Sequence, residues 1–222
     1  MFDRVISLIG IAKFKLIQEK TILVVGVGGV GGYAVESLVR SGIKKIIVID
    51  YDNIDVSNLN RQIITNVNNI GRSKVHELKK RMELINSECE IIDLALFLEQ
   101  DNFNIIDDYH IDYIIDACDC VNTKKLLIDY SLKKNIKLIS SMGTAKKMDP
   151  TCLKIVDIRQ TSYDPLAKII RKYVNSLKTK KKVMVVSSTE KPSDNQELAS
   201  MIFVPATAGL LCANYVIRDI IK

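Results

Sequence analysis

Short apolar runs rich in β-branched residues alternate with longer amphipathic segments through the first two thirds of the chain. The apolar runs read as buried parallel strands and cover residues 21–25, 46–50, 90–96, 113–116 and 137–141. The amphipathic segments between them are long enough for crossover helices and cover residues 30–41, 73–85 and 123–134. This alternation predicts an α/β fold with a doubly wound, mostly parallel, Rossmann-like sheet.

The alternation of strand and helix patterns changes after Gly143. The pattern there predicts a strand over residues 153–158, a helix over about 165–177, a strand over 183–188 and a final helix near 207–221. The polar stretch of residues 187–200 is typical of a surface loop. We therefore treat residues 1–143 as one region and residues 144–222 as a C-terminal extension packed on the same domain.

Composition narrows the class of protein. With 222 residues, 47% of them hydrophobic and 26% charged, the chain can bury a sizeable core, which excludes a disordered or fibrous protein. No apolar run approaches the roughly 20 residues needed to span a bilayer, and the N-terminus lacks the features of a signal peptide. The five cysteines are scattered without a Cys-x-x-Cys pair, as expected of reduced thiols in a cytoplasmic protein rather than a zinc site.

A glycine-rich segment, Gly26-Val27-Gly28-Gly29-Val30-Gly31-Gly32, joins the first strand to an amphipathic helix. Side chains at this position would keep the backbone away from phosphates, and the helix N-terminus presents unpaired N–H groups to them. Gly26, Gly28 and Gly31 fit the spacing G-x-G-x-x-G, and Asp50 follows at the end of the second strand, where it can accept hydrogen bonds from a ribose. The sequence therefore predicts a nucleotide-binding turn, which a nicotinamide-dependent oxidoreductase would also have.

Charged residues beyond Asp50 favour ATP over a dinucleotide. Arg61 and Lys74 could neutralise charge that develops on a leaving pyrophosphate, whereas hydride transfer needs no such cations. Asp119 follows the strand of residues 113–116, at the end of the sheet where ligands of open α/β folds bind. A carboxylate there suits Mg²⁺, which is usually held by one or two carboxylates plus substrate phosphates. A noncatalytic nucleotide-binding scaffold stays open as an alternative.

Five motifs follow one another with a characteristic spacing. They are Gly26-Val27-Gly28-Gly29-Val30-Gly31, Asp50-Tyr51-Asp52, Ser57-Asn58-Leu59-Asn60-Arg61-Gln62, Gly71-Arg72-Ser73-Lys74 and Asp116-Ala117-Cys118-Asp119. In this order they resemble the HesA/MoeB/ThiF superfamily, the adenylating relatives of ubiquitin-activating enzymes. The resemblance implies ATP and Mg²⁺ as cofactors.

The resemblance also implies a role for each site residue. Cofactor-binding roles fall on the glycine turn and on the segment after the second strand, namely Gly26, Gly28, Gly29, Gly31, Asp50, Asp52, Asn58, Arg61, Gln62 and Lys74. Catalytic roles fall on Arg61, Lys74, Asp119 and Arg4, with Asp119 also supporting Mg²⁺. Arg4 lies where such proteins lend an arginine to the ATP of the neighbouring subunit, so a homodimer is expected.

Further motifs occupy the last third: Ser140-Ser141-Met142-Gly143, Asp149-Pro150, Asp164-Pro165-Leu166-Ala167-Lys168, Ser187-Ser188-Thr189-Glu190-Lys191-Pro192 and Phe203-Val204-Pro205-Ala206-Thr207-Ala208-Gly209. They look like the tRNA threonylcarbamoyladenosine dehydratase branch of the superfamily, and the match covers nearly the whole chain. Some members carry a cysteine where this chain has Asp164, so no thioester can form at that position.

The branch implies an ATP-dependent dehydration. The threonyl carboxylate of threonylcarbamoyladenosine, next to the tRNA anticodon, would be adenylated, and the carbamoyl group would then close a ring and expel AMP. Holding both groups in one side chain makes the second step intramolecular. The alternative within the superfamily is an activator of a ubiquitin-like sulfur-carrier protein, and a sulfur-transfer or redox partner is left open.

The positive charge of the chain lies in its last third. Residues 1–143 carry 18 basic and 19 acidic side chains, a net charge of −1, while residues 144–222 carry 14 and 7, a net charge of +7. Neutralising phosphates with lysine and arginine is the main source of affinity for nucleic acids. The candidate tRNA-binding residues are therefore the helix and lysine run of this region, Arg171, Lys172, Lys178, Lys180, Lys181 and Lys182. A solvated helix end, where lysines favour the negative end of the helix dipole, explains the run equally well.

Overall fold

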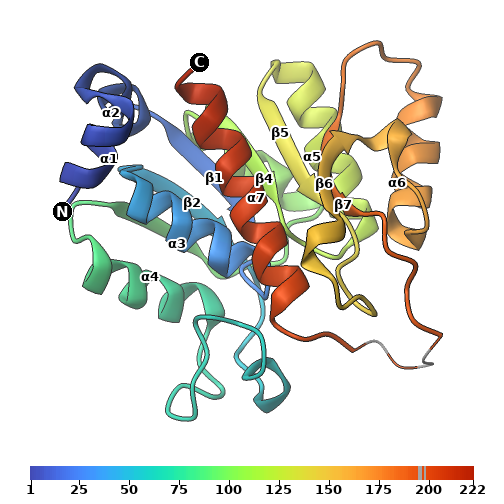
Figure 1. The fold of residues 1–222 in the computed structure, drawn as a ribbon, viewed down its shortest axis with the longest axis horizontal. Helices are drawn as coiled ribbons and strands as arrows, with labels where there is room; N and C mark the ends of the chain where they lie inside the picture. The colour runs from blue at the N-terminus through green and yellow to red at the C-terminus, as the bar shows by residue number, and fades with distance from the viewer. Residues whose placement is uncertain (195–196, 198) are drawn as a thin grey trace.

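A computed structural model describes residues 1–194, 197 and 199–222 of the chain. Within these residues a seven-stranded sheet has the order β3-β2-β1-β4-β5-β7-β6 (Figure 1). Its described strand pairs are parallel except for β6 with β7. The predicted doubly wound, mostly parallel sheet is thus confirmed. The strands are β1 (Thr21–Val25), β2 (Lys45–Ile49), β3 (Glu90–Leu94), β4 (Tyr113–Asp116), β5 (Lys137–Ser141), β6 (Leu153–Asp157) and β7 (Met184–Ser188).

Helices cover both faces of the sheet. The α-helices are α1 (Asp3–Ile9), α2 (Ile11–Gln18), α3 (Gly31–Ser41), α4 (Lys74–Ile85), α5 (Val121–Lys134), α6 (Pro165–Ser176) and α7 (Phe203–Ile220). Short 3-10 segments lie at η1 (Val56–Asn58), η2 (Gln100–Asp108), η3 (Pro150–Cys152) and η4 (Ile158–Gln160). Apolar side chains of α2, α3, α4 and α7 join one core layer, and those of η2, α5 and α6 join the other.

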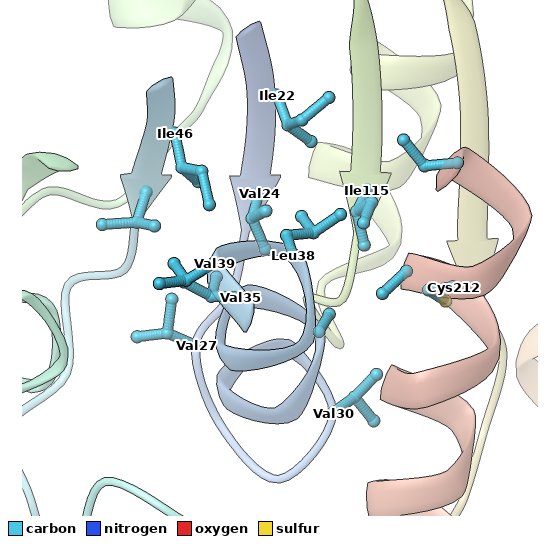
Figure 2. Close-up of a cluster of buried hydrophobic side chains, with 14 of the residues drawn as sticks. Ile22, Val24, Val27, Val30, Val35, Leu38, Val39, Ile46, Ile115 and Cys212 are labelled. Atoms are coloured by element: carbon cyan, nitrogen blue, oxygen red, sulfur yellow. The ribbon is translucent and has the colours of Figure 1, made fainter. Parts of the chain in front are cut away.

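Strand β1 shows why the central strands are apolar at every position. Ile22 and Val24 point into the layer under α3 and α7, whereas Leu23 and Val25 point into the opposite layer. All four side chains are buried because both faces of a parallel sheet are covered. Figure 2 shows the first layer, where Val24, Leu38 and Ile115 meet near Cys212 of α7.

Helix α7 packs closely against α3. A Cβ atom on Gly209 would lie 2.2 Å from the carbonyl oxygen of Val30, so only glycine permits this approach. The predicted start near residue 207 is wrong, since α7 begins at Phe203. Pro205 lies in its first turn, where a missing N–H costs no helical hydrogen bond. The early start brings the N-terminal end of α7 to the glycine-rich turn, because Pro205 lies 3.4 Å from the position of a Cβ on Gly29.

The loop before α7 is shorter than the sequence suggested. Ser187 and Ser188 belong to β7 and are buried, so the loop begins at Thr189. Of its expected residues, Asn195, Gln196 and Leu198 lie outside the described part of the chain. Among the described residues, no helix is long and apolar enough to cross a membrane. All five cysteines are free thiols.

Candidate functional site

A pocket of about 330 Å³ opens at the carboxyl ends of the central parallel strands. The residues that follow β1, β2 and β4 line it, as expected where the strand order of an open α/β sheet reverses. Most of the predicted nucleotide and catalytic residues meet here: Gly26, Gly28, Gly29, Asp50, Asp52, Asn58, Arg61, Gln62, Lys74 and Asp119. Gly31 and Arg4 do not line the pocket of this chain.

Two glycines close the turn behind the pocket. Gly26 has φ +85°, and a Cβ on it would lie 2.8 Å from the backbone of Ala117 after β4. A Cβ on Gly31 would lie 1.8 Å from the carbonyl oxygen of Gly26. Gly31 is therefore needed for close packing of the turn on α3, while Gly28 and Gly29 present their backbone to the pocket.

Asp50 ties the glycine turn to β2. Its carboxylate accepts hydrogen bonds from the N–H of Val27 at 2.8 Å and from the N–H of Asp52 at 2.9 Å. Burial raises the pKa of Asp50 above its usual value, although both backbone hydrogen bonds oppose the shift. Asp50 thus shapes the turn and faces the pocket at once.

Lys74 lies at the start of α4 and reaches back to the segment after β2. Its Nζ is 2.6 Å from the Oδ2 of Asp52, and only 6% of its side chain is exposed. The backbone N–H of Lys74 also donates to the carbonyl of Asp52. An almost buried ammonium group is therefore held at a fixed place in the pocket wall.

The polar wall across from the turn is built on η1. The Asp55 side chain caps this 3-10 segment and fixes the backbone of Ser57. Arg61 donates through Nη1 to the carbonyl oxygen of Ser57 at 2.7 Å, which orients its guanidinium group at the pocket. Gln62 is buried beside it, and its Oε1 has no hydrogen-bond partner among the described residues. This wall offers a cation and an amide to a bound anion.

A buried ion pair, which the sequence did not point to, supports the loop after β4. Lys124 of α5 is fully buried and donates to both carboxylate oxygens of Asp116, at 3.1 and 3.0 Å. It also donates to Ser140 Oγ and to the carbonyl of Ser141 on β5. Asp116 in turn accepts from the N–H of Cys118 at 3.3 Å. The pair anchors the loop that positions Asp119 at the pocket. A lysine eight residues after an aspartate forms no recognisable sequence motif, so the pair could not be predicted.

The two cysteines beside Asp119 differ in character. Burial, with the nearby charge of Asp116, raises the pKa of the Cys118 thiol well above its usual value. Burial also acts on Cys120, but hydrogen bonds from Thr123 outweigh it and lower the pKa of that thiol. Both line the pocket. Neither has a histidine partner to act as a base, so the site has no cysteine–histidine pair.

Asp119 is an exposed carboxylate on the pocket wall. In residues 1–194, 197 and 199–222 no group of three or more His, Cys, Asp or Glu side chains is arranged to hold a metal ion. Asp119 and Asp52 fit Mg²⁺ carried by a nucleotide, since such an ion takes most of its ligands from phosphates and water and only one or two from carboxylates. Asp50 also lines the pocket, but both of its carboxylate oxygens accept backbone hydrogen bonds.

The end of the pocket next to β3 is apolar. Leu96, Phe97 and Leu98 line it, and Tyr51 meets Phe97 edge to face with ring centroids 4.9 Å apart. The sequence pattern predicts a strand to residue 96, but β3 ends at Leu94, so the residues after it are free to line the pocket. An apolar slot beside Asp50 suits a flat heterocyclic base.

Arg4 and the basic residues of the last third lie away from the pocket. Arg4 is exposed on α1. Arg171 donates to the carbonyl and hydroxyl oxygens of Thr161, both at 2.7 Å, and so has a structural partner. Lys172 is exposed on α6.

The lysine run lies beyond the end of its helix. The suggestion that these residues occupy the last helical turn is wrong, because α6 ends at Ser176 and the run joins it to β7. Since β7 is parallel to β5, its start lies at the amino ends of the strands (Figure 1). The pocket lies at the opposite, carboxyl ends. Lys181 confirms this placement, as its Nζ donates to Leu132 and Asn135 at the end of α5. The whole run comprises Lys178, Lys180, Lys181 and Lys182.

Comparison with known proteins places the whole chain among adenylating enzymes. The sequence model of the ThiF family matches residues 2–221. A tRNA threonylcarbamoyladenosine dehydratase of Bacillus subtilis is 38% identical, and the match covers 100% of this chain and 94% of that protein.

Solved structures of a relative are also similar to this chain. The crystal structure of E. coli tRNA N6-threonylcarbamoyladenosine dehydratase in complex with ATP superposes with a TM-score of 0.93 and 33% identity, over 99% of this chain and 93% of that one. The complex of the same E. coli protein with AMP gives a TM-score of 0.92 and 32% identity. The fold and the placement of the strands are therefore those of this group of proteins.

Proposed function

Because the chain belongs to the ThiF family, we propose that it uses ATP to dehydrate N6-threonylcarbamoyladenosine next to the anticodon of tRNA. The reaction is a cyclisation that proceeds through adenylation of the threonyl carboxylate. One observation carries the proposal: Lys74, Arg61 and the glycine turn converge on a pocket that also holds Asp119 and whose described lining includes no nucleophile paired with a base. Such a site activates a carboxylate supplied by the substrate.

The pocket has a place for each part of ATP. The slot of Leu96, Phe97 and Leu98 takes the adenine, and Asp50 accepts hydrogen bonds from the ribose. The phosphates then follow the backbone of Gly28 and Gly29 toward Arg61 and Lys74. Gln62, whose Oε1 lacks a partner, and Asn58 complete the polar lining at that end.

Asp119 is the residue that would hold Mg²⁺ together with the phosphates. When bound, the ion supplies charge neutralisation to the triphosphate. The protein contributes the orientation of that carboxylate, because the loop carrying it is fixed by the Asp116–Lys124 pair.

The chemistry needs two displacements and no covalent enzyme intermediate. An oxygen of the threonyl carboxylate attacks the α-phosphorus, a new C–O–P link forms, and pyrophosphate leaves. The carbamoyl group then attacks the activated carbonyl carbon, loses a proton, and AMP leaves with the carboxylate oxygen. Arg61 and Lys74 stabilise the charge that accumulates on the leaving pyrophosphate, an interaction strongest in the transition state.

A homodimer completes the proposal. Helices α1 and α2 expose apolar side chains that a single chain leaves in water: Leu8 is 84% exposed, Ile11 54% and Leu16 44%. Burying such a surface against a second copy is favourable. The same helices carry Arg4, which would then reach the ATP of the partner subunit.

Substrate-dependent release of AMP tests the proposal. Purified protein is incubated with MgATP and either tRNA carrying threonylcarbamoyladenosine or a small carrier protein that ends in Gly-Gly. We expect AMP to accumulate with the modified tRNA only. Pyrophosphate exchange that requires the Gly-Gly carrier, with none from the tRNA, would contradict the proposal and favour a sulfur-carrier activator.

A further inference from the structure

The lysine run of residues 178–182 cannot contact the modified nucleotide when its threonylcarbamoyl group enters the pocket. It lies at the amino ends of the parallel strands, and the pocket lies at their carboxyl ends. A tRNA that presents its anticodon loop to the pocket must therefore meet a different part of the surface first. The rim of the pocket shows which part.

The order of the strands identifies the substrate side of the pocket. Phe97 follows β3 and Thr144 follows β5, and three strands lie between β3 and β5 in the sheet. The glycine turn and Asp50 follow β1 and β2, on the side of Phe97. ATP thus fills the side next to β3, and the carboxylate substrate enters on the side of Thr144.

A buried ion pair fixes the rim beside Thr144. The Nζ of Lys147 lies 3.0 Å from the Oδ2 of Asp164 and 2.6 Å from the carbonyl oxygen of Gly143, and both charged side chains are 1% exposed. The other carboxylate oxygen of Asp164 accepts from the N–H of Ala167 and caps α6. This pair joins the pocket rim to the start of α6, although Lys147 and Asp164 are 17 residues apart.

Tyr163 is next to this pair in the sequence. It precedes Asp164, has φ +57°, and is 57% exposed. Arg171 holds the preceding backbone through Thr161 at 2.7 Å. The left-handed backbone turns the ring outward instead of into the core, an orientation uncommon for a residue with a large side chain.

A lysine lies over the ring. The Nζ of Lys191 is 5.3 Å from the centroid of Tyr163. Its neighbour Glu190 accepts hydrogen bonds from the N–H groups of Met148 at 2.9 Å and Asp149 at 3.0 Å, so this part of the loop is tied to the same rim. Two segments far apart in the sequence thus place an aromatic ring and an ammonium group together beside the substrate side of the pocket.

We propose that Tyr163 and Lys191 form a docking rim for single-stranded RNA, in which the ring stacks on a base next to the modified adenosine and the lysine neutralises a phosphate. This inference rests on the proposed function and deepens it. Stacking on aromatic rings together with phosphate neutralisation is the usual way in which proteins bind unpaired nucleotides. Buried Lys147 and Asp164 act as positioning residues for the rim.

Binding of an anticodon stem–loop RNA that carries threonylcarbamoyladenosine tests the rim without relying on turnover. Tyr163→Ala should weaken binding about tenfold, within the range of one lost base stack, while Tyr163→Phe keeps wild-type affinity. Lys191→Ala should reduce the slope of log K against log salt by about 1. Lys133→Ala is the matched control, since it removes one exposed lysine in the last turn of α5, outside the candidate tRNA-binding residues, and should change neither quantity.

Steady-state kinetics with the same RNA separates docking from chemistry. Tyr163→Ala should raise the KM for RNA about tenfold and leave the dissociation constant of ATP unchanged. Equal RNA affinity in wild type, Tyr163→Ala and Lys191→Ala would overturn the rim. Tight binding that depends on Tyr163 with no dehydrated product would instead contradict the proposed function, so the two failures are distinguishable.

Discussion

The Nζ of Lys74 lies 2.6 Å from the Oδ2 of Asp52, so the cation assigned to the triphosphate is already paired within the pocket. The pair orients an ammonium group that is almost buried before any nucleotide is present. When a phosphate oxygen of the nucleotide binds Lys74, it replaces the carboxylate of Asp52 as the anionic partner. The lysine therefore need not be desolvated again. This arrangement makes the pocket preorganised for charge stabilisation.

Replacing Lys74 should therefore greatly reduce turnover without unfolding the protein. For Lys74→Met we expect AMP formation to fall by about a hundredfold to a thousandfold, the usual effect of losing one preorganised partner of transition-state charge. Lys79→Met is the matched control on the same helix, because Lys79 pairs with Asp93 outside the pocket. Similar activity in both variants would contradict the role of Lys74.

Cys120 should report occupancy of the pocket. Hydrogen bonds from Thr123 lower the pKa of its thiol, whereas burial raises that of Cys118, so iodoacetamide should modify Cys120 first at neutral pH. Because Cys120 lines the pocket, ATP should slow its alkylation. Peptide mass spectrometry of the modified protein measures both rates. Faster modification of Cys118, or no protection by ATP, would be inconsistent with this geometry.

The buried pair of Lys124 and Asp116 should matter for stability as well as for the loop that bears Asp119. Lys124→Met leaves a carboxylate buried without its cation, and loss of one partner of such a pair costs about 3–5 kcal/mol. Urea unfolding should show this loss. Lys125→Met, one position along α5 on a more exposed side, should cost less than about 1 kcal/mol. Equal unfolding midpoints for the two variants would contradict the importance of the buried pair.

Glu36 of α3 makes stability depend on pH. Burial alone would raise its pKa, but hydrogen bonds from Arg81 and Arg40 outweigh burial and lower the pKa below the usual value. A carboxyl group whose pKa is lower in the folded state stabilises the fold above its unfolded pKa of about 4.3, and this contribution disappears as the pH falls through the folded pKa. The difference in melting temperature between wild type and Glu36→Gln should thus be full at pH 7 and shrink below about pH 4. A difference that grows in acid would contradict the assignment.

The central sheet could be predicted from the sequence because its strands are covered on both faces. Residues such as Ile22, Leu23 and Val24 are apolar at consecutive positions for that reason, and the helices between strands follow from their amphipathic period. The start of α7 was placed too late, since a proline in the first turn resembles a break in the pattern although Pro205 fits there.

The local features of the site could be predicted from the sequence, whereas its long-range contacts could not. Gly28, Asp50 and Lys74 could be predicted because motif spacing carries them to one end of the sheet. The Lys147–Asp164 pair could not, as neither residue has a local pattern that reveals a partner 17 positions away. The position of Lys180 and its neighbours relative to the pocket required the direction of β7, which local sequence does not encode.

The most direct test of the account is the mass of the modified nucleoside after reaction. tRNA carrying threonylcarbamoyladenosine is incubated with the protein and MgATP, digested to nucleosides, and analysed by mass spectrometry, with Lys74→Met in parallel. We expect a nucleoside lighter by one water with wild-type protein, dependent on ATP and formed far more slowly with the variant. An unchanged nucleoside with folded, ATP-binding wild-type protein would contradict it.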